Sequence, residues 1–133
     1  MKMINIVPLK SVGSVGFGMT RVQVRSVWGE FKEFRKTKFS KYSTDDFGFV
    51  HVFYDENDQC IAVEVFMEDE TKVSVDGKIF SNKEFAILKS VISDFHTDDD
   101  CNFISPEFSL GVSLAEGVIV SITCGKKDYY KNA

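Results

Sequence analysis

Apolar residues recur at helical spacing over residues 20–28, and capping residues stand at both ends of this stretch. Thr20 and Gln23 have the spacing of a capping box, in which each side chain satisfies a backbone N–H of the first turn. Gly29 provides a C-cap, because glycine readily adopts the conformation that ends a helix. The apolar stripe consists of Val24, Val27, Trp28 and Phe31. The pattern predicts a helix that ends at Gly29, with Phe31 packed just beyond it.

A second helical pattern starts after Ser81, which has Glu84 at the same capping-box spacing. The apolar positions that follow are Phe85, Leu88, Val91, Ile92 and Phe95. The polar run from Thr97 to Asp100 ends this pattern. We expect the second helix to be the more regular of the two.

Each helical pattern is followed by two runs of β type that are joined by an acidic turn. Residues 47–54 and 59–66 flank the turn Asp55-Glu56-Asn57-Asp58, and residues 108–114 and 118–123 flank Ala115-Glu116-Gly117. The order of elements is therefore the same in both halves. We predict a single α+β domain over residues 1–133, an antiparallel sheet with two helices on one face. The order also indicates a duplicated α-β-β unit with copies at 11–68 and 73–125, although two common motifs can match by chance.

The composition favours a folded protein with one core. Hydrophobic residues make up 44% of the 133 residues, and 13 of them are Phe. The start of the chain lacks the apolar stretch of an export signal, and no segment is long and apolar enough to span a membrane. We therefore expect a cytoplasmic protein without a membrane partner. Cys60, Cys101 and Cys124 are expected to be free and buried, while a disulfide between two of them stays open.

Charge is divided unevenly along the chain, whose net charge is −4. Residues 1–41 carry nine Lys or Arg and two Glu, whereas most acidic residues follow later. Such a division can steer a charged partner to one surface. It can equally fold so that the basic and acidic segments cancel each other.

One local motif resembles a known family. The run Gly18-Met19-Thr20-Arg21-Val22-Gln23-Val24, followed by Trp28-Gly29, resembles the signature of small bacterial domains related to BamE, the lipoprotein subunit of the outer-membrane barrel-assembly machine. The resemblance covers roughly residues 16–66 and implies helices packed on an antiparallel sheet that holds other proteins, without catalytic residues. The chain departs from that family because no lipidated cysteine stands near its start.

In size and in its acidic runs the chain is also similar to the immunity proteins that accompany bacterial secreted toxins. This likeness implies a non-enzymatic inhibitor that neutralises a cationic toxin by direct binding, since complementary charge speeds association. The expected contact residues are the acidic ones, namely Asp45, Asp46, Asp55, Glu56, Asp58, Glu68, Asp69, Glu70, Asp98, Asp99 and Asp100. The alternatives are a scaffold or adaptor module, and a nucleic-acid binder that would use Arg35, Lys36, Lys38 and Lys41.

The sequence carries little sign of catalysis or of a cofactor. His96, Asp98, Asp99, Asp100 and Cys101 are residue types that bind metals, but the paired spacing of a zinc site and the glycine of a calcium loop are both missing. The other histidine, His51, lies in a predicted strand. We therefore predict no catalytic residue, no metal site and no cofactor. The oligomeric state is left open.

Overall fold

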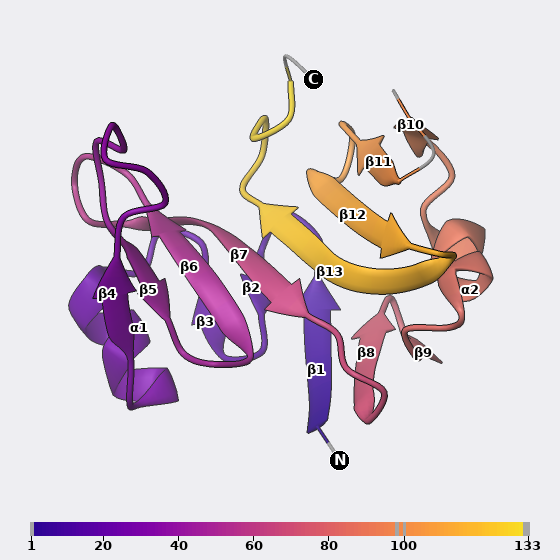
Figure 1. Ribbon diagram of the computed structural model, residues 1–133, viewed down its shortest axis with the longest axis horizontal. Coiled ribbons are helices and arrows are strands. Elements are labelled where there is room, and N and C mark those ends of the chain that lie inside the picture. The colour runs from indigo at the N-terminus through magenta and orange to yellow at the C-terminus, as the bar shows by residue number, and fades with distance from the viewer. Residues whose placement is uncertain (1, 98, 100, 132–133) are drawn as a thin grey trace.

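The computed structural model describes residues 2–97, 99 and 101–131, and these form two β-sheets with two short helices (Figure 1). Strands hold 45% of the chain and helices 12%. The predicted α+β class, a sheet with two helices on one face, is therefore wrong, and the protein is mostly β. The prediction failed because several strands of two to four residues lie in segments whose pattern predicts turns or loops.

The larger sheet has eight strands, all antiparallel to their neighbours. Its order is β10 (His96–Thr97), β11 (Asn102–Ser105), β12 (Leu110–Ala115), β13 (Val118–Gly125), β7 (Cys60–Phe66), β6 (Val50–Tyr54), β5 (Thr44–Asp46) and β4 (Lys32–Phe34). The two predicted hairpins are confirmed as β6–β7 and β12–β13. They meet in the middle of the sheet, where β7 pairs with β13.

The smaller sheet has five strands and lies behind the larger one in Figure 1. Its order is β3 (Val15–Gly16), β2 (Ser11–Val12), β1 (Lys2–Val7), β8 (Thr71–Val75) and β9 (Lys78–Phe80). The central strand β1 is parallel to β8, and the other pairs are antiparallel. Pro8 follows directly after β1, which agrees with the loss of a backbone donor at proline.

The two helices differ in how they begin. Helix α1 (Arg21–Trp28) starts with the predicted capping box between Thr20 and Gln23 and ends at Gly29. Helix α2 (Phe85–Val91) is shorter than predicted. The Glu84 carboxylate accepts from the Ser81 backbone N–H, but this forms a turn ahead of the helix, and Ile92 is already extended. Figure 1 shows the helices at opposite ends of the larger sheet.

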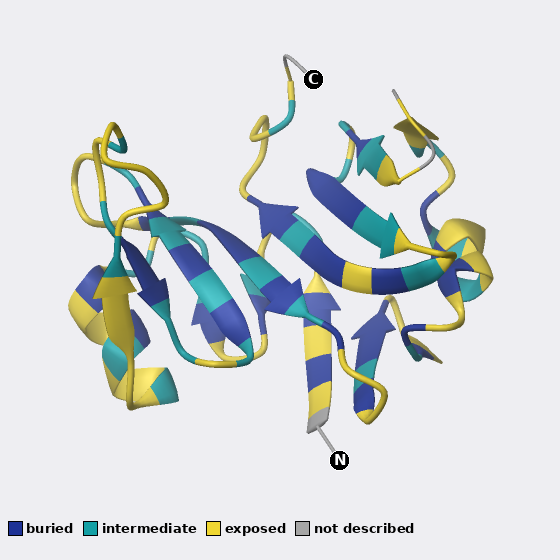
Figure 2. Cartoon of the chain, in the orientation of Figure 1, coloured by how far each residue is buried: buried dark blue, intermediate teal, exposed yellow. Residues whose placement is uncertain are grey.

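The core lies between the two sheets, and strand alternation supplies it. Along β6 the residues Val50, Val52 and Tyr54 are buried while those between them are partly exposed (Figure 2). The smaller sheet contributes Ile4, Ile6, Val73 and Val75, and α1 contributes Val24. Burial of these apolar side chains is the main force that holds the sheets together.

The strand order of the larger sheet is symmetric about β13 and β7, and among the described strands of the smaller sheet only β3 lacks a counterpart across the β1–β8 pair. Each half of the chain forms an antiparallel hairpin at the middle of the smaller sheet, then a helix, then a four-stranded meander in the larger sheet. In both long hairpins a register shift follows the fourth residue of the first strand, Phe53 in β6 and Ser113 in β12. This symmetry is what a duplicated unit would produce. Duplication itself stays a prediction. The repeated order of elements starts at β1 and β8, ahead of the predicted bounds 11–68 and 73–125.

The C-terminal segment covers glycines in the second half of the larger sheet. A Cβ atom at Gly111 would collide with the Tyr130 hydroxyl, and one at Gly125 would collide with the Tyr129 side chain. The matching positions in the first half, the second residue of β6 and the last of β7, hold His51 and Phe66, whose rings are in contact at 4.6 Å. The tyrosines therefore fill a space that the first half fills from its own strands.

We predict that Gly111→Ala destabilises the protein by roughly 1–3 kcal/mol, the usual cost of overpacking. The added carbon would lie 2.9 Å from Cζ of Tyr130, so the ring must move. Urea unfolding measures the change, and the same substitution in a Tyr130→Ala background should cost much less. Gly16→Ala is the control, because its nearest neighbour would be Lys10 O at an ordinary 3.6 Å. An equal cost with and without Tyr130 would contradict the packing.

Candidate functional site

The predicted acidic contact residues do not form one surface. Asp45 and Asp46 lie on β5, Asp55, Glu56 and Asp58 in the β6–β7 turn, Glu68, Asp69 and Glu70 in the β7–β8 loop, and Asp99 in the β10–β11 loop. Asp98 and Asp100 lie outside the described residues. The structure therefore gives these acids several different roles.

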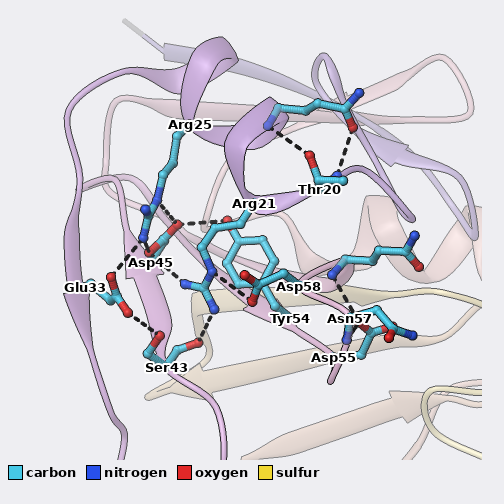
Figure 3. Close-up of polar contacts among 12 residues, drawn as sticks. Thr20, Arg21, Arg25, Glu33, Ser43, Asp45, Tyr54, Asp55, Asn57 and Asp58 are labelled. Carbon is cyan, nitrogen blue, oxygen red and sulfur yellow. Dashed lines mark hydrogen bonds and ion pairs between the residues drawn. The ribbon is translucent and has the colours of Figure 1, made fainter.

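Asp45 is fully buried, with a side-chain exposure of 0%, so it cannot contact a partner directly. Arg25 donates to both of its oxygens, from Nη2 at 2.7 Å and Nε at 2.8 Å, and Arg21 Nη1 donates at 3.2 Å (Figure 3). The Tyr54 hydroxyl donates to the same carboxylate at 3.0 Å. Its prediction as a contact residue is wrong, because the carboxylate is the centre of an internal ion-pair network.

The network extends to β4 and to the β6–β7 turn. Arg21 also pairs with Asp58 at 3.2 Å, while Arg25 pairs with Glu33 at 3.0 Å. The Ser43 hydroxyl donates to Glu33 at 2.6 Å, and this bond together with Arg25 holds the pKa of Glu33 below its usual range. Burial, followed by the Asp45 charge, raises the pKa of Tyr54, so its hydroxyl stays a donor. Each buried charge is thus paired, as buried charges must be.

This pairing accounts for part of the basic N-terminal segment. Besides the two arginines on α1, Lys36 lies 3.9 Å from Glu64 and above the Phe53 ring at 4.3 Å. Arg35 donates to the Ser40 carbonyl at 2.6 Å. Within the described part of the chain, Lys38 and Lys41 keep no acidic partner. Among the described residues of this segment, ion pairs with acids are formed by Arg21, Arg25 and Lys36, so the division of charge is cancelled only in part.

Several of the remaining acids shape their own turns. Asp55 accepts from the backbone N–H groups of Asn57 and Gln59, at 2.9 and 3.0 Å. Asp69 accepts from the Asn82 amide at 3.1 Å. Asp99 accepts from the N–H groups of Cys101 and Asn102, which lowers the pKa of Asp99.

By contrast, the carboxylates of Glu56, Glu68 and Glu70 are exposed and form no ion pair with any described side chain. Glu68 and Glu70 stand beside a hollow of about 660 Å³, which we call the aromatic groove. The groove is lined by Met3, Phe47, Gly48, Phe49, Phe66, Glu68, Glu70 and Thr71. It lies where β1 starts, where β5 turns into β6 and where β7 leaves the sheet. Segments from both sheets therefore build it together.

The aromatic surface continues beyond the groove. Trp28 meets Phe47 and Phe49 edge to face, with ring centroids 5.6 and 5.4 Å apart, and Phe31 lies 6.2 Å from Phe47. Met3 is 51% exposed and Phe31 42% exposed. A neighbouring hollow of about 310 Å³ adds two acids, Glu30 and Asp46, and one cation, Lys32, to this strip. The result is an aromatic surface edged mainly by acids, and such a surface suits a ligand with apolar and cationic groups.

Metal ligation and nucleophilic chemistry find little support among the residues the structure describes. No group of three His, Cys, Asp or Glu side chains there is arranged to hold a metal ion. His51 packs between the rings of Phe34 and Phe66 and lies 3.6 Å from Asp46. Neither helix in the described chain is long and apolar enough to cross a membrane.

Comparison with known proteins gives no relative: no protein-family model, curated protein or solved structure matches the chain significantly. The resemblances to BamE-related domains and to immunity proteins therefore stay expectations drawn from the sequence.

We predict that Asp45→Asn destabilises the protein by about 3 kcal/mol or more, the usual cost of removing one partner from a buried ion pair. The substitution leaves Arg21 and Arg25 without the buried charge that both contact. Thermal and urea unfolding measure the effect. Asp46→Asn is the matched control, since Asp46 is one residue away and partly exposed, and an amide oxygen can still accept from the Gly48 N–H. Equal effects of the two substitutions would contradict this role of Asp45.

The three cysteines are free and should differ sharply in reactivity. Cys101 is exposed, contrary to expectation, whereas Cys60 and Cys124 are buried. Burial raises the pKa of Cys60 to about 12 and also raises that of Cys124. Because the thiolate is the reactive form, we predict that a thiol reagent at pH 8 modifies Cys101 alone, with the other two reacting only after unfolding. Rapid labelling of folded Cys101→Ser would contradict this burial.

Proposed function

We propose that this protein is a non-enzymatic binding domain that captures a basic segment of a partner protein in the aromatic groove. The observation that carries the proposal is the combination of three aromatic rings, Phe47, Phe49 and Phe66, with two exposed carboxylates, Glu68 and Glu70. None of the described residues that line the groove is a cation. Apolar contact would supply affinity, and the carboxylates would select a cationic ligand.

The groove leaves aromatic surface and two carboxylates exposed to water. Covering apolar surface gains roughly 25 cal/mol for each Å² removed from solvent, and aromatic anchors dominate most protein interfaces. Carboxylates at the rim remain partly solvated, so they contribute to the rate of encounter and to selectivity more than to affinity. The carboxylates disfavour a nucleic acid in this groove, since its phosphates would meet them.

Within this class, we propose inhibition of a cationic bacterial toxin in the cytoplasm as the specific role. Support comes from the small acidic chain and its likeness to immunity proteins. Of the eleven acids expected to make contact, Glu68 and Glu70 lie in the groove and Asp46 beside it. A scaffold or adaptor module is the more general form of the same proposal.

Trp28, the single tryptophan, reports on this groove because it contacts Phe47 and Phe49. We predict that a hexapeptide with a Lys-Phe-Lys core changes Trp28 emission at micromolar concentrations, and that the Glu-Phe-Glu counterpart binds at least about tenfold more weakly. In Glu68→Lys/Glu70→Lys the preference should reverse. Glu107→Lys/Glu116→Lys, with the same change of charge in two other loops, is the control and should keep the original preference.

If the peptides bind equally well, or if both double variants change selectivity alike, the groove does not select cations. If neither peptide binds at millimolar concentration, the groove is not a site for basic segments. Either result would sink the proposal.

A further inference from the structure

The loop between β4 and β5, residues 35–43, presents a phenylalanine to solvent. Phe39 is 85% exposed, more than any other large hydrophobic side chain in the described chain. The loop is ordered by its own bonds: the Ser40 N–H donates to the Thr37 carbonyl at 3.1 Å, and Arg35 donates to the Ser40 carbonyl at 2.6 Å. The backbone on either side of Phe39 is therefore bonded within the loop, and the ring lies in solvent.

The cations beside Phe39 complement the aromatic groove. Lys36 pairs with Glu64, whereas Arg35 bonds only the Ser40 carbonyl. Lys38 and Lys41 have no acidic partner among the described residues, and neither has Arg35. The loop offers one exposed ring and two lysines. The groove offers aromatic rings and two glutamates, Glu68 and Glu70, that form no ion pair with a described side chain, so the two sets are complementary. The groove, at about 660 Å³, has ample room, since an apolar cavity of roughly 150 Å³ holds a benzene ring.

The loop of one molecule cannot reach its own groove. The loop precedes β5, whereas Phe47, Gly48 and Phe49 follow it, so the two features lie at opposite ends of that strand (Figure 1). Any contact between them must therefore join two copies of the chain.

We propose that the β4–β5 loop of one copy docks into the aromatic groove of a second copy, with Phe39 against the aromatic rings and Lys38 and Lys41 beside Glu68 and Glu70. The inference rests on the proposed function of the groove and adds its regulation, because a partner protein would have to displace the loop. The contact is reciprocal in a twofold dimer, or it continues head to tail as a chain of molecules.

A polyanion is the competing ligand for this loop. Nucleic-acid binding usually draws on several free cations and a basic face. The few cations of this loop, on a protein of net charge −4, fit an acidic groove better than a row of phosphates.

Sedimentation equilibrium of the protein alone tests the proposal. We expect association that weakens with salt, because the paired charges are exposed. Lys38→Glu/Lys41→Glu and Glu68→Lys/Glu70→Lys should each weaken it at least about tenfold, while an equimolar mixture of the two variants restores a complex through the exchanged charges. Phe39→Ser should weaken it to a similar extent. Lys78→Glu/Lys83→Glu, in exposed positions on other elements, is the control and should leave association unchanged.

Three results would overturn the proposal: a monomer at millimolar concentration in low salt, association that both charge reversals leave intact, or a mixture that fails to restore binding. Tight binding of a single-stranded oligonucleotide that Lys38→Glu/Lys41→Glu abolishes, without any change in self-association, would also overturn it. Peptide binding at Trp28 is measured separately, so the groove can still bind basic segments if self-association fails.

Discussion

The buried carboxylate of Asp45 is the constraint on which the first half of the molecule depends. A buried charge is tolerated only with full pairing, and here two arginines and a tyrosine provide it. Asp45 is paired across the sheet with Val52, whose side chain is also buried. A slip of one residue would move Asp45 to the opposite face, so its ion pairs fix the register of β5. The β4–β5 loop and the Phe47–Phe49 turn begin from the two ends of this strand and are therefore positioned by it.

The second half meets the same packing requirement without charge. Arg21, the first residue of α1, binds Asp45, whereas Phe85, the first residue of α2, packs on Phe103 of β11 at 5.1 Å. Phe103 pairs with Val112, the third residue of β12, as Asp45 pairs with the third residue of β6. An apolar contact is often as stable as a buried ion pair, so both solutions are physically sound. The exposed Phe39 and most of the lining of the aromatic groove belong to the first half. Glu68, Glu70 and Thr71 of the groove come from the β7–β8 loop and the start of β8.

The sequence predicted the elements whose signals are local. The capping box of α1 and the hairpins β6–β7 and β12–β13 depend on neighbouring residues, and all were found. The N-terminal run that forms β1 was predicted to be extended, and residues 73–80, which form β8 and β9, were predicted to be a hairpin with an Asp-Gly turn. Their union in a separate sheet was not predicted, because β1 pairs with β8 across a long separation in sequence. Asp45-Asp46 resembles a turn signal, and its partners on α1 lie too far away in sequence to be recognised. Phe47 and Phe49 were predicted in a strand, but β6 starts at Val50, which leaves both rings at the groove.

The central claim is that the aromatic groove is the surface through which the protein binds basic segments of other proteins. Chemical-shift mapping of the ¹⁵N-labelled protein during titration with the Lys-Phe-Lys peptide tests it most directly. The account predicts the largest shifts at Gly48, Phe49 and residues 68–71, together with the Trp28 indole. Largest shifts in the β6–β7 turn at residues 55–58, or in the β10–β11 region at residues 99–102, would contradict it.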